Sequence, residues 1–453
     1  MRNLRDNDNP AADWSVAMKR DWDERARSDA KWFINSRRLS QPEEEFDADG
    51  KRDVDALIMK DLDLLTQGGE PKQMKVLELG CGIGRMTKYL ASIFGEVHAT
   101  DVSGEMIRTA RERLKGLDSV RLYETSGYDL GELEDNYFDF AFSAFVFRHV
   151  PTPEIIEENL REAYRVLKPG GVMRFHTNSI TVFDFEDLEK DTWLGASFSD
   201  ALIRRFGNAV GAQIISIYGV GKKDCWTTLR KPVEKADPQP PSKLKIDSFG
   251  QARDFSKKSI PLSGEDSALA LMVSGLSPST VCCNSITVEI DGMPVPPRFA
   301  GPRSTKGNPE LVIVEADVPI ATPEGELDVR LVSAGSVASD VIKVLFFKPT
   351  PVMPEIVAVT NAADGGDEIA VRGPKSRLRL LVRGLDRSAD TGNVRIQIGD
   401  RILRPASMGF NQAKEVCEVD AQLPSETQSG SVKIILYFGN LASPPVTVDI
   451  GPA

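Results

Sequence analysis

The residues best suited to chemistry lie in a short glycine-rich turn, V-L-E-L-G-C-G-I-G-R, at residues 76–85. A turn that binds a dinucleotide needs the spacing G-x-G-x-x-G, in which the third glycine lets the following helix pack closely. Here the glycines are spaced G-x-G-x-G, and Arg85 stands where that third glycine would be. The pattern therefore does not fit NAD.

Two carboxylates accompany this turn. Glu78 comes two residues before the first glycine, where an anion suits an ammonium or sulfonium group better than a pyrophosphate. Asp101 ends the next predicted strand, roughly twenty residues after the turn, where a carboxylate can accept hydrogen bonds from both ribose hydroxyls. The two carboxylates together predict a nucleoside with a cationic amino-acid tail, and S-adenosylmethionine is such a molecule.

Four motifs in order resemble the class I S-adenosylmethionine-dependent methyltransferases, in particular the type 11 group. They are V-L-E-L-G-C-G-I-G (76–84), V-H-A-T-D-V-S-G-E-M-I (97–107), F-D-F-A-F-S (138–143) and Y-R-V-L-K-P-G-G (164–171). Weaker similarity in W-D-E-R-A-R (22–27) and C-W-T-T-L-R-K-P (225–232) resembles the ends of one bacterial branch of these enzymes. The resemblance implies methyl transfer, with S-adenosylmethionine as the cofactor.

The resemblance also implies which residues bind the cofactor. Those expected to contact the methionine portion and the ribose are Glu78, Gly80, Cys81, Gly82 and Asp101. Those expected around the adenine are Val102, Met106, Gly127 and Tyr128. Ser143, at the end of F-D-F-A-F-S (138–143), is also expected to contact the cofactor. Many family members bind the adenine amine through an acidic residue near position 126, but this sequence offers Thr125, Ser126 and Asp129. Which residue binds the amine is left open.

His149, in F-V-F-R-H-V-P, is the candidate catalytic residue. It follows the fourth predicted strand, at the edge of the sheet where doubly wound folds bind ligands. An imidazole with an ordinary pKa near ~6.5 can accept a proton at neutral pH. Alternatively, His149 orients its loop through backbone hydrogen bonds. Arg148 either contacts an acceptor carboxylate or is solvated, whereas His176 and His98 are more typical of structural histidines.

The elements that must position these residues alternate between strand and helix. Strands are predicted at 76–79, 96–101, 120–123, 138–143 and 172–176, and helices at 84–94, 104–115 and 153–167. A helix at 199–206 and a hairpin of 214–220 with 225–229 complete a domain at 71–232. The alternation predicts an α/β, Rossmann-like fold with a doubly wound, mostly parallel sheet and a C-terminal antiparallel hairpin.

Residues 1–70 are predicted to form an N-terminal helical cap. One helix face carries apolar residues at every third or fourth position: Trp14, Met18, Trp22, Ala26, Ala30 and Phe33. Residues 41–52 are predicted to be a loop before a second helix. The first helix is either a lid over the cofactor, with Trp22, Arg25 or Trp32 near the acceptor, or plain packing on the flank of the sheet.

The C-terminal half contains a repeated module behind a proline-rich linker, residues 233–243. V-S-G-L (273–276) and I-T-V-E-I (286–290) match V-R-G-L (382–385) and V-R-I-Q-I (394–398). Alternating apolar residues predict two all-β sandwiches, residues 244–350 and 351–453. The copies resemble the immunoglobulin-like IPT/TIG modules of bacterial multidomain proteins.

Composition narrows the class of partner. The 453 residues carry a formal net charge of -11, which disfavours nucleic acid and anionic lipid. Five cysteines at irregular positions indicate neither a disulfide framework nor a metal site, so a cytoplasmic protein is expected. No apolar run has membrane-spanning length, and the charged N-terminus does not fit a signal peptide.

The acceptor is expected to be a small molecule or a saccharide, recognised first of all by D-T-W-L-G-A-S-F-S (191–199). One alternative is a catalytically silent, cofactor-binding scaffold whose β-modules bind a partner protein or a glycan. The intact motifs favour the enzyme. A nucleotide-dependent oxidoreductase is a second alternative, and the misplaced third glycine counts against it. The β-modules are expected to contact a partner chain or each other.

Overall fold

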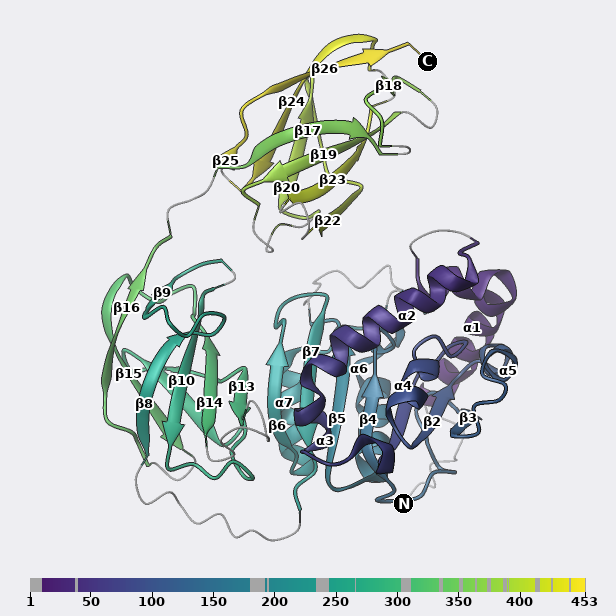
Figure 1. Cartoon of the computed structure of the whole chain (residues 1–453), viewed down its shortest axis with the longest axis vertical. Coiled ribbons are helices and arrows are strands. Elements are labelled where there is room, and N and C mark those ends of the chain that lie inside the picture. Colours follow the sequence, from purple (N-terminus) through teal and green to yellow (C-terminus); the bar gives the residue numbers. More distant parts are fainter. Residues whose placement is uncertain are drawn as a thin grey trace, which may run out of the picture. The chain divides into compact units, whose positions relative to one another are not determined.

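The structure is a computed structural model of the whole chain (Figure 1). It describes residues 10–36, 40–179, 192–193, 195–233, 244–264, 266–302, 311–333, 337–349, 353–362, 365–372, 376–385, 389, 391–411, 416–424, 427–439 and 441–452. The predicted linker lies outside the described residues from position 234 to 243. The chain divides into two compact units, the first made of Met1–Gly250, Leu269–Asp317 and Leu327–Val344, the second of Gln251–Ala268, Val318–Glu326 and Leu345–Ala453.

The first unit contains the predicted sheet (Figure 1). Its strands are β1 (Lys75–Leu79), β2 (Glu96–Asp101), β3 (Val120–Glu124), β4 (Phe138–Ser143), β5 (Leu167–Thr177), β6 (Gln213–Tyr218) and β7 (Cys225–Arg230). Within the described residues they lie in the order β3-β2-β1-β4-β5-β7-β6. β1 to β5 pair in parallel, and β7 pairs antiparallel with β5 and β6. This confirms the predicted Rossmann-like sheet with its terminal hairpin.

Helices α4 (Thr87–Ile93), α5 (Gly104–Arg113), α6 (Pro153–Val166) and α7 (Asp200–Val210) connect the strands. Side-chain oxygens of Ser103, Thr152 and Ser199 accept hydrogen bonds from the first turns of α5, α6 and α7, which explains where these helices begin. α4 begins three residues after the predicted Gly84. Gly84 has a φ of +81°, outside the helical region, so the turn continues past it.

The N-terminal region contains α1 (Pro10–Ile34), α2 (Glu43–Leu57) and α3 (Leu62–Thr66). Figure 1 shows α1 beside α5. The prediction of a loop at residues 41–52 is wrong, because most of that segment is the first part of α2. Three glutamates in the first turn favour a helix N-terminus there, and Phe46 is buried within the helix. Tertiary packing therefore outweighed the polar composition of the segment.

One face of the sheet is covered by α2, α3 and α4. Their apolar side chains form a core with those of the central strands: Val54, Leu65, Leu90, Val76, Phe140 and Phe142. α6 contacts β5 and α7 contacts β6. None of the helices in the described part of the chain is long and apolar enough to cross a membrane.

The C-terminal half contains two strand-rich copies. The first has β8 (Lys245–Gln251), β9 (Ser259–Pro261), β10 (Ala268–Ser274), β11 (Ile286–Ile290), β12 (Met293–Val295), β13 (Phe299–Gly301), β14 (Val312–Asp317), β15 (Gly325–Ser333) and β16 (Ile342–Phe347). The second has β17 (Glu355–Asn361), β18 (Ile369–Ala370), β19 (Arg377–Arg383), β20 (Val394–Ile398), β21 (Arg401–Leu403), β22 (Ser407–Asn411), β23 (Val416–Gln422), β24 (Gly430–Phe438), β25 (Leu441–Ala442) and β26 (Val446–Gly451).

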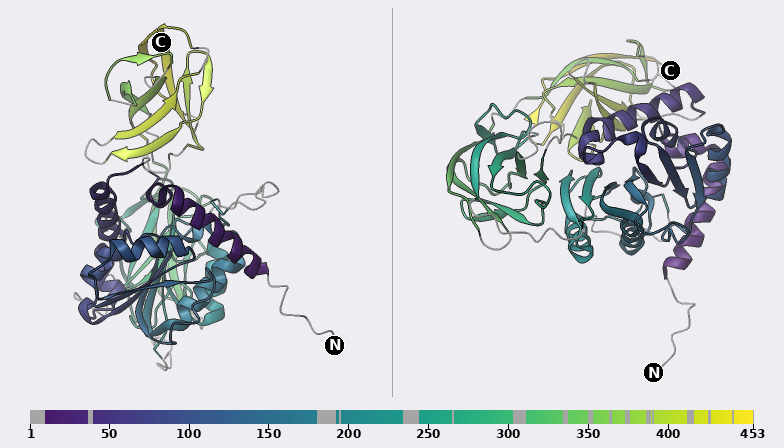
Figure 2. Two further views of the ribbon diagram at one scale, coloured as in Figure 1. Left: turned by 90° about the vertical axis from the view of Figure 1, so that its right-hand side faces the viewer. Right: turned by 60° about the horizontal axis from the view of Figure 1, so that its bottom comes forward.

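The strands of the two copies lie in corresponding orders. In the first copy the described strands lie in the orders β13-β14-β10-β8 and β12-β11-β15-β16-β9. In the second they lie in the corresponding orders β22-β23-β19-β17 and β21-β20-β24-β26-β18. Figure 2 shows the second copy, green to yellow, as two facing layers of strands. Its core is formed by alternating side chains such as Leu378, Leu380, Ile396, Val419 and Ile434.

Within the first unit, the parallel sheet continues directly into the first copy. β6 pairs antiparallel with β13 at Ser216 and Phe299, and the Ile217 amide donates to the Arg298 carbonyl at 2.8 Å. The side chains of Leu64, Ile215 and Phe299 form a shared apolar cluster. The hairpin edge of the parallel sheet is therefore covered by a strand from the first copy.

Candidate active site

The glycine turn after β1 lies against apolar side chains from two other segments. Gly80 and Gly82 have φ angles of +72° and +55°, a region that favours glycine. A Cβ at Gly80 would lie 2.3 Å from Val146 Cγ2, and one at Gly82 would lie 2.6 Å from Ile34 Cδ1. The absence of side chains thus lets Val146 and Ile34 lie directly on the turn.

The turn forms one wall of a cavity, called here the central cavity. Nine predicted site residues line it: Glu78, Gly80, Cys81, Gly82, Asp101, Val102, Met106, Gly127 and His149. Tyr128 and Ser143 are not part of the lining. The Tyr128 amide donates to Ser126 Oγ within a loop, and the buried Ser143 hydroxyl donates to the Leu79 carbonyl at 3.4 Å.

Glu78 is a buried carboxylate near the end of β1, with 4% of its surface exposed. Burial raises the pKa of Glu78 to about 7, although a hydrogen bond from Thr87 and the charge of Arg85 lower it. Arg85 is itself buried and donates to Asp53 Oδ2 at 2.6 Å. A cationic ligand in the cavity would favour the ionised form of Glu78.

Asp101 links β2 to the glycine turn. Its Oδ2 accepts the Gly82 amide at 2.8 Å, and its Oδ1 accepts the Ser103 amide at 2.9 Å. Burial raises the pKa of Asp101 to about 6, against the effect of these hydrogen bonds. Since each carboxylate oxygen can accept more than one hydrogen bond, Asp101 can still accept from the hydroxyls of a ligand.

Helix α1 forms another wall of the central cavity, through Met18, Trp22, Phe33 and Ile34. It is fixed beside Asp101, because Asp23 accepts hydrogen bonds from Ser103 Oγ at 2.6 Å and from the Glu105 amide at 3.2 Å. The helix thus both packs on the flank of the sheet and lines the cavity, so the two predicted roles are compatible.

The expected adenine side of the cavity is lined by Val102, Met106, Thr125 and Gly127. The two other candidates for binding the adenine amine are engaged locally. Ser126 Oγ accepts the amide of Asp129, and the Asp129 carboxylate accepts the Gly131 amide at 2.6 Å. Asn159 of α6, which the sequence analysis missed, also lines this side. The sequence signal that could have found it is a polar residue at an otherwise apolar position on the buried face of a helix.

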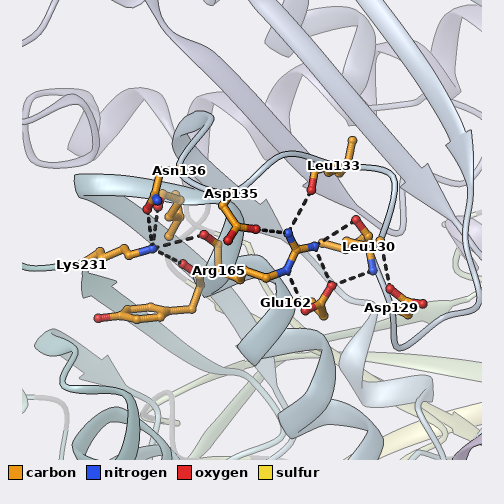
Figure 3. Close-up of polar contacts among 11 residues, drawn as sticks. Asp129, Leu130, Leu133, Asp135, Asn136, Glu162, Arg165 and Lys231 are labelled. Carbon is orange, nitrogen blue, oxygen red and sulfur yellow. Dashed lines mark hydrogen bonds and ion pairs between the residues drawn. The ribbon is translucent and has the colours of Figure 1, made fainter.

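Helix α6 holds the loop between β3 and β4 in place (Figure 3). Arg165 donates to the carbonyls of Leu130 and Leu133, while Glu162 accepts the Leu130 amide at 3.1 Å. Lys231 donates to carbonyls at the end of α6, including that of Arg165 at 3.2 Å. Two segments of the motifs, Y-R-V-L and C-W-T-T-L-R-K-P, thus have a structural role here.

An aromatic cluster lies next to the central cavity and consists of Trp22, Trp32, Phe33, His149 and Trp193. The Trp32 and Trp193 rings stack with centroids 6.0 Å apart. The Trp22 and His149 rings form an edge-to-face pair with centroids 5.5 Å apart. The Arg25 guanidinium lies 4.8 Å from the Trp22 centroid and 5.5 Å from that of Trp193. Arg25 also donates to Thr192 Oγ1 at 2.8 Å. The described part of the predicted acceptor segment, 191–199, is thereby joined to α1.

His149 is partly buried within this cluster and lines the cavity. Its Nδ1 lies 2.6 Å from the Trp193 carbonyl, so Nδ1 carries the proton and Nε2 carries the lone pair of the neutral ring. Burial lowers the pKa of His149 to about 4, although the bond to Trp193 raises it. The geometry accommodates both predicted roles, a base through Nε2 and an anchor for the loop through Nδ1.

The other two histidines, His98 and His176, contact polar side chains outside the central cavity. His98 Nε2 lies 2.8 Å from Glu96 and its Nδ1 lies 3.0 Å from the Tyr123 hydroxyl. His176 is fully buried, 3.0 Å from Asp224, which is also 3.8 Å from Arg148. Within the described residues, no group of three or more His, Cys, Asp or Glu side chains could hold a metal ion.

Comparison with known proteins supports the expected family. Residues 77–175 match the family model described as a methyltransferase domain, which confirms the resemblance inferred from the four motifs. Part of the chain is similar to demethylmenaquinone methyltransferase of Staphylococcus aureus (strain MRSA252), at 34% identity over 119 residues. Phosphoethanolamine N-methyltransferase 2 of Caenorhabditis elegans is 37% identical over 98 residues.

These similarities are partial in extent. The first covers 26% of this chain and 45% of the relative, and the second covers 21% of this chain and 22% of the relative. The chain therefore spans less than half the length of these curated relatives. A crystal structure of a SAM dependent methyltransferase from Aquifex aeolicus shares 24% sequence identity at a TM-score of 0.30, covering 41% of this chain and 98% of that one.

Proposed function

We propose that this chain is an S-adenosylmethionine-dependent methyltransferase acting on a small-molecule or saccharide acceptor. The observation that carries the proposal is the convergence of Glu78, the glycine turn and Asp101 on one cavity. Glu78 and the Gly80–Gly82 backbone would bind the methionine portion, and Asp101 would bind the ribose. The adenine would lie between Val102 and the loop at Gly127. The match of residues 77–175 to a methyltransferase domain supports these roles.

When bound, S-adenosylmethionine supplies a methyl group on a sulfonium, ready for in-line displacement. The chain's own contribution would be to align the acceptor and to exclude water. Such alignment can contribute ~7–11 kcal/mol in favourable cases. Apolar lining residues, among them Trp22, Phe33, Val146 and Phe147, suit the exclusion of water.

His149 would receive a proton from an acceptor hydroxyl or amine through Nε2. An acceptor atom becomes strongly acidic as it gains a methyl group, so a neutral imidazole of low basicity is sufficient. The Nδ1 bond to the Trp193 carbonyl would hold the ring in the tautomer that leaves Nε2 unprotonated.

The aromatic cluster would recognise the acceptor. Trp22 and Phe33 line the cavity, and flat apolar surfaces of this kind stack on planar rings and on the apolar faces of sugars. Because the two relatives are named for a demethylmenaquinone and a phosphoethanolamine substrate, both compounds belong in an acceptor panel beside saccharides.

The test is an acceptor screen with S-adenosylmethionine radiolabelled on the methyl group, scored by transfer of label to each acceptor. Transfer that requires His149 and Asp101 would support the enzyme. The alternative, a silent scaffold whose β-modules bind a partner protein or glycan, would bind the cofactor without transferring label to any acceptor in the panel.

The domain boundaries form part of the same proposal: a cap at 1–70, the methyltransferase domain at 71–232, and modules at 244–350 and 351–453. The matching strand orders support two copies of one module. An immunoglobulin-like fold for each copy, a cytoplasmic location and self-association through the modules complete the proposal.

A further inference from the structure

Asn159 is a polar side chain on the buried face of α6. It has 8% of its surface exposed, and it lies between Ile155, Ile156 and Leu160, which are buried as well. Burying a carboxamide is costly unless its hydrogen-bonding groups find partners. The side chain also lines the central cavity beside Thr125 and Gly127. A ligand in the cavity would therefore contact this side chain.

The hydrogen bonds of Asn159 define which atom is left for a ligand. Its Nδ2 donates to the Gly127 carbonyl at 2.5 Å and to the Ile155 carbonyl at 2.8 Å. Both partners are acceptors, so the nitrogen must be the atom that faces them, and the reversed amide would place two acceptors together. Both donor hydrogens are thereby used, and Oδ1, on the opposite side of the carboxamide, is the acceptor.

The surrounding residues explain why this acceptor matters. Ser126 Oγ accepts backbone amides of its own loop, and the Asp129 carboxylate accepts the Gly131 amide. Neither side chain lines the cavity. Asn159 is bonded directly to Gly127, the residue expected at the adenine edge. The acceptor of Asn159 is therefore on the side of the cavity where the adenine is expected.

We propose that Asn159 is the residue that reads the adenine amine, with Oδ1 accepting a hydrogen bond from the 6-amino group. This rests on the proposed function and adds a specificity-determining residue to it. A 6-oxo purine would place a second acceptor opposite Oδ1, and leaving such a polar pair unsatisfied costs about 10- to 100-fold in affinity. The site would thus prefer adenine to hypoxanthine.

The experiment is calorimetric titration with S-adenosylhomocysteine and with its hypoxanthine analogue. The wild type should prefer the adenine ligand by about 10- to 100-fold. Asn159→Leu, of similar volume, should weaken binding of the adenine ligand without weakening that of the analogue, so that the preference falls to within about threefold. Thr125→Val tests the competing candidate on the same side of the cavity and should keep the preference if Asn159 reads the amine.

Three results would overturn this inference alone. Equal losses for both ligands in Asn159→Leu would show a structural role only, and loss of preference in Thr125→Val would assign the reading to Thr125. Equal binding of both ligands by the wild type would refute it even if Asn159→Leu failed to fold. Binding of neither ligand by the wild type is distinct, because it would refute the proposed function and this inference with it.

Discussion

The hydroxyl of Thr87, in the first turn of α4, donates a hydrogen bond to the Glu78 carboxylate at 2.5 Å. The bond joins the strand before the glycine turn to the helix after it, and it holds a buried carboxylate whose pKa is raised to about 7. The charge on Glu78 therefore changes within the physiological pH range.

This relationship predicts a pH-dependent affinity for the cofactor. Below about pH 7 Glu78 is mostly neutral and must lose its proton before it can pair with an ammonium group. The association constant of S-adenosylhomocysteine should thus rise as pH rises through about 7, by up to tenfold per unit. Glu78→Gln should bind more weakly at pH 8 and lack this rise. Calorimetry from pH 6 to 8 is the measurement, and an unchanged pH profile in Glu78→Gln would contradict the assignment.

The raised pKa of Glu78 also predicts how the stability of the unliganded protein depends on pH. The carboxyl has a higher pKa in the folded state than in the unfolded state, whose value is near 4.5. The contribution of Glu78 to the free energy of unfolding should therefore fall as pH rises from about 4.5 to about 7. Denaturant melts of the wild type and Glu78→Gln across this range measure the difference, which should grow with pH in favour of the variant.

His149→Asn separates the two roles of the imidazole. The asparagine amide can still donate to the Trp193 carbonyl, but it offers no basic nitrogen. If Nε2 accepts the proton, kcat should fall by about 10²–10⁴ with little change in cofactor affinity. Steady-state kinetics with the acceptor found in the screen give the answer. A kcat within a few-fold of the wild type would mean that His149 only positions Trp193.

Trp22→Ala tests the acceptor side of the cavity. Loss of the ring should raise KM for the acceptor by about 2- to 12-fold, since an aromatic contact of this kind contributes about 0.5–1.5 kcal/mol beyond burial. Trp14→Ala is the matched control, because Trp14 lies on the same helix and does not line the cavity. Equal effects in the two variants would point to the fold of α1 rather than to acceptor binding.

Phe299→Ala tests whether the first copy stabilises the parallel sheet. Phe299 is 3% exposed and packs on Ile215 and Leu64, so the substitution should cost about 3–5 kcal/mol. The transition that S-adenosylhomocysteine stabilises should shift to lower temperature in a thermal melt. Ile320→Ala, at a position 99% exposed, should leave it unchanged. An unshifted transition in Phe299→Ala would show that the two parts unfold independently.

Local signals were sufficient to predict the strands, the glycine turn and nine of the residues that line the cavity. Gly80, Gly82 and Asp101 lie at the ends of two adjacent parallel strands. Their spacing along the chain is therefore enough to predict that they lie close together. Asn159 could not be found in this way, because its position at the cavity depends on how α6 packs against the loop at Gly127. The first part of α2 was missed because its sequence is mostly polar. The segment is helical because Phe46 is buried against the rest of the protein, which the local sequence does not indicate.

The pairing of β6 with β13 lay beyond prediction for a related reason. Strand partners more than eighty residues apart leave no periodic pattern, and the single paired position, Ser216 with Phe299, has no distinguishing residue type. The internal repeat, by contrast, could be recognised from short sequence segments that recur in the C-terminal half. The corresponding strand orders are consistent with that repeat.

The most direct test of the central claim is calorimetric titration of S-adenosylmethionine and S-adenosylhomocysteine into the wild type and Asp101→Ala, with NAD as the control ligand. We expect the wild type to bind both sulfur ligands and not NAD, and we expect Asp101→Ala to lose that binding while keeping its thermal transition. Failure of the wild type to bind either ligand, or tight binding of NAD, would contradict the claim.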